Sequence, residues 1–158
     1  MDTAGRRTMV RIMGKTGLVL LLSFVMLESD AMNPDPFRLR LSALMGFLAI
    51  ALGASGAHGA VHDKLVAVGK MANWDTAVQY HLPHAVVLLL LALLAGRKPL
   101  LVWAWRLFFV GILLFSGSLY VLAYTGITKL GAITPLGGLS FMVAWILIAM
   151  SAKGKPTE

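Results

Sequence analysis

The chain has 158 residues, of which 58% are hydrophobic and only 13% charged, with a mean hydropathy of +0.80. A soluble domain carries about twice this charged fraction, so the composition excludes an ordinary soluble globular protein. The formal net charge is +7, but the basic residues lie at the ends of apolar runs without interleaved aromatic residues, so we expect no nucleic-acid partner.

Four windows of the sequence contain no Asp, Glu, Lys or Arg. They are 21 to 23 residues long and cover residues 41–62, 76–96, 107–128 and 130–152. About 20 helical residues cross a hydrocarbon core of about 30 Å, and only regular structure satisfies the backbone polar groups there. We therefore predict an all-α integral membrane protein, a four-helix bundle with spans at about residues 41–61, 76–96, 102–125 and 134–152.

Several details refine these spans. Arg106 lies close enough to the start of the third span to snorkel back to the lipid headgroups. Thr134 is suited to cap the last helix, because Pro135 in the first turn loses no needed donor. The polar segment 62–75 is expected to be a loop.

The distribution of basic residues predicts an orientation, because cytoplasmic loops carry the excess of Lys and Arg. One side of the membrane would hold only Lys64, Lys70 and Lys129. We therefore expect both termini of the four-helix core on the opposite, cytoplasmic side or its topological equivalent. The basic residues on that side are Arg38, Arg40, Arg97, Lys98, Arg106, Lys153 and Lys155.

Residues 1–31 form an amino-terminal extension that resembles a signal peptide, with basic residues before an apolar run at 16–27 and a cleavage site after Ala31. The run is too short to span the bilayer. A working signal would place Arg38 and Arg40 on the wrong side, so the alternatives are a natural start at Met32 or an interfacial amphipathic anchor. We favour Met32, which makes 32–158 the transmembrane domain.

Small residues recur at steps of three and four along the first span. A face of small side chains allows close approach of two helix backbones in lipid. The partner of this face is either another helix of the chain or a second copy. The predicted packing positions are Gly46, Gly53 and Ala57 on the first span, Gly111 and Ser118 on the third, and Gly137 and Gly138 on the fourth.

All four histidines lie around the first hairpin: His58 and His62 at i and i+4, and His81 and His84 at i and i+3. Both spacings place a pair on one helical face, so the pairs can converge on zinc, copper, nickel or haem iron. Pro83 also frees a carbonyl oxygen nearby. The alternative is that the histidines only hydrogen-bond within the fold. We favour this alternative and expect no cofactor, because no carboxylate or thiolate completes the ligand set.

Catalytic motifs are missing from the sequence, which has no Gly-x-Ser-x-Gly elbow, phosphate-binding Gly-Lys-Ser loop or His-Glu-x-x-His. It also lacks cysteine, which excludes disulfides and thiolate chemistry. Ser116, Tyr120 and Tyr124 share a face of the third span and would line a polar path or form interhelical hydrogen bonds. We expect no enzyme activity.

Four sequence blocks, in order, resemble the YgdD-like small membrane proteins, the family of domain of unknown function 423, which includes a eukaryotic branch. The blocks are 53–58, 80–85, 114–120 and 133–138, with Trp145 beyond. The resemblance covers about residues 41–152 and implies a four-helix protein of a bacterial inner membrane or related organelle. Members commonly have Gln and an aromatic residue at the positions of His81 and Pro83, so the resemblance leaves His58 and His84 as the better ligand pair.

The sequence therefore predicts a small multi-pass inner-membrane protein, non-catalytic, which acts by helix packing as an accessory or assembly component. Its partners would be the lipid bilayer and a membrane protein or a second copy. One alternative is an oligomeric pathway for ions or small molecules. The other is a metal- or haem-binding protein that uses the histidines.

Overall fold

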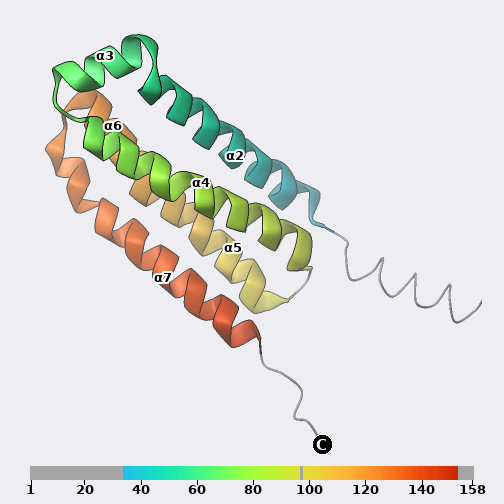
Figure 1. Cartoon of the computed structure of the whole chain (residues 1–158). Coiled ribbons are helices and arrows are strands. Elements are labelled where there is room, and N and C mark those ends of the chain that lie inside the picture. Colours follow the sequence, from blue (N-terminus) through green and yellow to red (C-terminus); the bar gives the residue numbers. More distant parts are fainter. Residues whose placement is uncertain (1–33, 97, 153–158) are drawn as a thin grey trace, which may run out of the picture. The chain divides into compact units, whose positions relative to one another are not determined.

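The computed structural model describes residues 34–96 and 98–152, and the expectations for residues 1–31, Met32, Arg97, Lys153 and Lys155 lie outside this part. Four helical segments in it are long and apolar enough to cross a membrane. Figure 1 shows them side by side. The all-α fold with four spans is thus confirmed, whereas the cytoplasmic placement of the ends stays a prediction. The segments are Pro36–Ala57, Met71–Leu94, Pro99–Thr125 and Thr128–Ser151.

The first span, α2 (Pro36–Ala57), begins five residues before the charge-free window. Asp35 caps it, because one carboxylate oxygen accepts the backbone N–H groups of Phe37 and Arg38 at 2.9 and 3.3 Å. The N–H of Arg38 also holds the pKa of this carboxyl group below its usual value. The cap therefore stabilises the start of α2 outside the charge-free window.

The segment after α2 is not the loop that the sequence predicted. Gly59, with φ of 75°, turns the chain into a short helix, α3 (Gly59–Ala67). Leu65 of α3 is fully buried against a cluster that includes Trp74 and Tyr120. Val61 of the same helix also packs against this cluster, so burial of apolar side chains stabilises α3.

The second span is α4 (Met71–Leu94). The third consists of α5 (Pro99–Ile112), a π-helical turn η1 (Leu113–Gly117) and α6 (Ser118–Thr125). A 3₁₀ turn, η2 (Thr128–Ala132), leads into α7 (Thr134–Ser151).

The last helix starts at Thr134 as predicted, with Pro135 in its first turn. The capping role of Thr134 is wrong, however. Its hydroxyl instead shares a hydrogen bond of 2.8 Å with Ser118 of α6. The side chain therefore ties two spans together.

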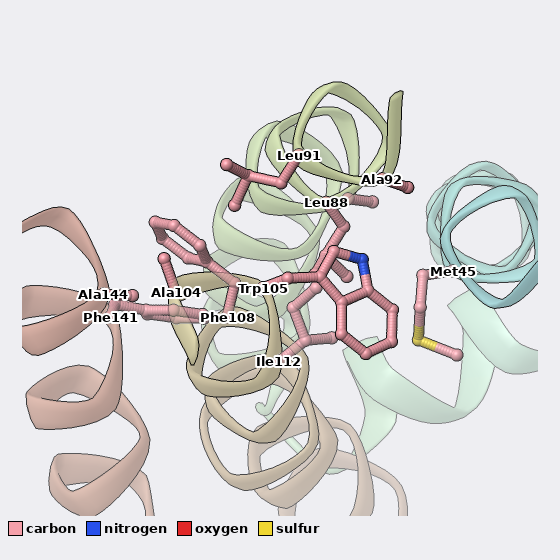
Figure 2. Close-up of a cluster of buried hydrophobic side chains, with 11 residues drawn as sticks. Met45, Leu88, Leu91, Ala92, Ala104, Trp105, Phe108, Ile112, Phe141 and Ala144 are labelled. Carbon is pink, nitrogen blue, oxygen red and sulfur yellow. The ribbon is translucent and has the colours of Figure 1, made fainter. Parts of the chain in front are cut away.

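In the helix arrangement, α4 and α5 lie in the middle, α2 packs along α4, and α7 packs along α5. Figure 2 shows α2 and α7 on opposite sides of this central pair. Trp105 of α5 reaches toward α2, where its Nε1–H donates to Ser42 Oγ at 3.0 Å. Leu88 and Phe108 are fully buried, so side chains fill the space between the central helices.

The predicted packing glycines occupy different environments. A Cβ on Gly53 would lie 3.3 Å from Val78 of α4, and one on Gly138 would lie 3.8 Å from the ring of Phe115. One on Gly46 would meet nothing within 4 Å, and Ala57 is exposed, so the packing expected at these two positions does not occur between helices of the described chain.

The contact face of α2 instead carries Ser42, Met45, Ala49 and Gly56. Gly56, which is not one of the predicted packing positions, lies directly against the indole ring of Trp74.

We expect Gly56→Ala to lower the free energy of unfolding by about 1–3 kcal/mol, because the new methyl group would occupy the place of the Trp74 ring. Gly46→Ala is the matched control on the same helix, and we expect it to be neutral or slightly stabilising. Unfolding of the purified protein in mild detergent, followed by circular dichroism, measures both. Equal losses from the two variants would contradict this account.

Candidate functional site

The four histidines do not converge. Among residues 34–96 and 98–152, no group of three or more His, Asp or Glu side chains is placed to hold a metal ion. His58 is exposed at the end of α2, and His62 donates from Nδ1 to the carbonyl of Gly56 at 2.9 Å. His81 and His84 lie inside α4 and face different helices, so the convergence of both pairs, which the spacing allowed as the less favoured alternative, does not occur. Metal binding by a pair stays a prediction.

His81 is buried, with Nδ1 3.4 Å from the hydroxyl of Tyr120 on α6. Its Nε2 and the Oγ of Ser116 are buried without a hydrogen-bond partner in the described part of the chain. Tyr124, by contrast, is exposed beneath Lys64, whose Nζ lies 3.6 Å from the ring centroid. Ser116, Tyr120 and Tyr124 therefore do not form one continuous exposed path.

Arg106 is exposed and does not contribute to a buried site. Its guanidinium lies over the ring of Trp103, 4.8 Å from the centroid, one turn closer to the start of α5. This is the direction in which the sequence predicted it to snorkel.

His84 has the best-defined environment of the four. Its Nδ1 lies 2.7 Å from the carbonyl oxygen of Tyr80, one turn earlier in α4. A carbonyl only accepts, so Nδ1 must carry the hydrogen, and in the neutral ring Nε2 then keeps its lone pair. The imidazole therefore offers an acceptor on the side that points away from its own backbone.

Stacking fixes the plane of this ring. The His84 and Phe141 rings are nearly parallel, at 9°, with centroids 3.8 Å apart. Phe141 of α7 can lie there because Gly111 has no side chain. A Cβ at this position would lie only 2.5 Å from the Phe141 ring. Gly137 similarly allows α7 to approach the backbone of Phe115. Gly111 and Gly137 thus allow Phe141 to lie where its ring stacks on that of His84.

A lateral groove of about 620 Å³ lies beside this ring. Its outer edge is formed by side chains of α7 that are about half exposed, at 54% for Leu139, 59% for Met142 and 50% for Trp145. Since these residues lie within a membrane-spanning helix, the groove opens toward lipid. We call it the His84 groove; it is lined by Tyr80, His84, Phe115, Pro135, Gly138, Leu139, Phe141, Met142 and Trp145.

The π-helical turn η1 forms the inner wall of the His84 groove through Phe115. The ring of Phe115 lies 4.6 Å from that of Tyr80 and 5.8 Å from that of Phe141. π-Turns inside α-helices often occur at functional sites. Sequence reasoning missed Phe115, Tyr80 and Phe141, because apolar periodicity does not reveal a π-turn or the partner of an aromatic ring.

We expect the His84 ring, in its neutral form, to carry its hydrogen on Nδ1. The reason is the short contact to the Tyr80 carbonyl. Nitrogen NMR of imidazole-labelled protein in lipid at alkaline pH distinguishes the protonated nitrogen from the lone-pair nitrogen. Exposed His58, which has no side-chain hydrogen bond to a carbonyl in the described part, serves as control with averaged tautomers. An Nε2–H signal from His84 would contradict the geometry.

Comparison with known proteins identifies the family of the chain. Residues 52–138 match the model of a protein family of unknown function, DUF423. The chain is 47% identical over 119 residues to the UPF0382 membrane protein YwdK of Bacillus subtilis, covering 71% of the chain and 92% of the relative. It is 36% identical over 118 residues to the UPF0382 inner membrane protein YgdD of Escherichia coli, covering 73% and 88%.

No solved structure matches the chain. The names of the relatives, together with four apolar helices, agree with the predicted multi-pass protein of the inner membrane. They also confirm the resemblance drawn from the sequence blocks. The chain belongs to the DUF423 family of small membrane proteins.

Proposed function

We propose that this protein is a non-catalytic accessory component of the membrane that binds a lipid-soluble small molecule in the His84 groove. The observation that carries the proposal is the groove itself, about 620 Å³ in volume. Ligand pockets are commonly about 300–1,000 Å³, mostly apolar, with a few placed polar groups. The groove has these properties.

The chemistry of the lining favours an uncharged ligand. Carbon-rich side chains dominate it, and the polar groups that it offers are the His84 ring, the Tyr80 hydroxyl and the Trp145 indole N–H. An ion or a charged metabolite would lose its hydration there without a compensating charge. A molecule already dissolved in the bilayer loses no such hydration and reaches the open side directly.

A second candidate is the assembly role expected from the sequence. The specific observation in its favour is Gly46 of α2, where a Cβ would meet nothing within 4 Å. A small residue with open space beside it permits close approach of a helix from a second copy. The oligomeric pathway and the metal or haem role stay predictions; a pathway would have to run between copies, because Phe108 and Leu88 fill the centre.

We expect photochemical labelling to show the groove occupied in native membranes. A photoreactive amino acid at Met142 should give a discrete small-molecule adduct by intact-mass measurement. Val143, the next residue of α7, is 38% exposed but does not line the groove, so it is the matched control and should not form this adduct. Equal lipid labelling at both positions would contradict the proposal, as would a crosslink from Met142 to another protein.

The assembly candidate has its own test. If a second copy packs on Gly46, Gly46→Leu should abolish a crosslinked dimer in native membranes, because the larger side chain would separate the backbones. Val86→Leu, on an exposed position of α4, is the control and should leave the dimer unchanged. A dimer that persists in Gly46→Leu, or no dimer in the unmodified protein, would remove this candidate.

A further inference from the structure

We infer that the occupant of the His84 groove is a planar, lipid-soluble molecule with a ring hydroxyl, of the hydroquinone or phenol class, and that this hydroxyl donates a hydrogen bond to His84 Nε2. The inference rests on the proposed function and adds the chemical class of the ligand. It involves no covalent or redox step.

The donor requirement follows from the tautomer of His84. Nδ1–H already donates to the Tyr80 carbonyl, so the neutral ring presents only a lone pair at Nε2. A ligand that offers only acceptors, such as a quinone carbonyl, an ester or an ether, would place two lone pairs against each other. Protonation of the ring would make Nε2 a donor, but a charged side chain is costly within the bilayer. A hydroxyl group is the uncharged match.

The planar ring follows from the walls of the groove. Tyr80, Phe115, Phe141 and Trp145 supply aromatic faces and edges from α4, η1 and α7. Aromatic rings attract one another at centroid distances of about 4.5–7 Å, in offset or edge-to-face arrangements. Such walls favour a flat ring over a flexible acyl chain, whose contacts would be similar on any apolar surface.

The direction of the hydrogen bond is also fixed in advance. His84 lies flat on Phe141, with centroids 3.8 Å apart, and its Nδ1 is anchored on the backbone. The imidazole therefore cannot turn freely to suit a ligand. A preorganised acceptor increases affinity, because no ordering cost is added at binding.

The open side of the groove accounts for entry and for an apolar tail. Leu139 and Met142 form a half-exposed edge within a membrane-spanning helix. The lining extends along α7 from Pro135 to Trp145, which is about 15 Å of helix at 1.5 Å per residue. A ring fits beside His84, while a tail leaves sideways into lipid.

The test uses the full chain in lipid nanodiscs and three matched probes. They are an alkyl-substituted benzohydroquinone, the corresponding benzoquinone, and the dimethyl ether of the hydroquinone. Equilibrium dialysis against empty nanodiscs corrects for partition into lipid. We expect the hydroquinone to bind about tenfold more tightly than the two acceptor-only probes, the usual size of one hydrogen bond. In His84→Phe, which keeps the ring and its stacking, the preference should disappear. His58→Phe is the control and should retain it.

Two further variants keep the result interpretable if His84→Phe does not fold. His84→Gln supplies an amide oxygen as acceptor and should retain part of the preference. Leu139→Phe narrows the groove and should weaken binding of all three probes. Equal binding of the three probes would overturn the inference, and so would a haem absorption spectrum or bound iron in the purified protein. If the photoreactive amino acid at position 142 still forms its specific adduct, the proposed function survives that outcome. Without the adduct, the proposed function and the inference about the ligand class both fail.

Discussion

The close approach of α7 to the third span determines the geometry of the whole site. Gly137 lies against the backbone of Phe115, and Gly111 lies against the ring of Phe141. Lipid is as apolar as the side chains, so helices in a bilayer associate through van der Waals contact and interhelical hydrogen bonds. Ser140 adds such a bond by donating to the carbonyl of Leu107 at 2.7 Å. A larger residue at either glycine would move Phe141, and with it the surface on which His84 rests.

Polar side chains in the other half of the bundle are largely used for structure. Trp105 donates to Ser42, Trp74 donates to the carbonyl of Leu52 at 3.0 Å, and Arg38 donates to the carbonyl of Gly96 at 3.0 Å. Each bond joins two elements that are distant in sequence. His84 differs, because its one side-chain hydrogen bond is made within its own helix and its ring lines a groove. His84 is therefore a candidate to bind a ligand, whereas Trp105, Trp74 and Arg38 stabilise the fold.

Several features were predictable from residues alone because they depend on local properties. Charge-free windows predicted four spans, since the thickness of the bilayer sets the length of a helix. Gly111, Gly137 and Gly138 were recognisable as packing positions, because small residues let helix backbones approach closely in lipid. The sequence also located His84 in the second span. It did not identify α3, whose formation depends on burial of Leu65 by residues far along the chain.

What the sequence by itself determined was the class of protein, the number of spans, the family and some of the small residues at which helices approach. Only the tertiary structure decided which way each side chain points. It separated the four histidines, left open space beside Gly46, placed a π-turn at Phe115 and left a groove beside His84. The physical reason is that length and polarity are properties of one segment, whereas a site depends on the rotation of several helices about their axes. That rotation is set by contacts between residues that no spacing rule connects.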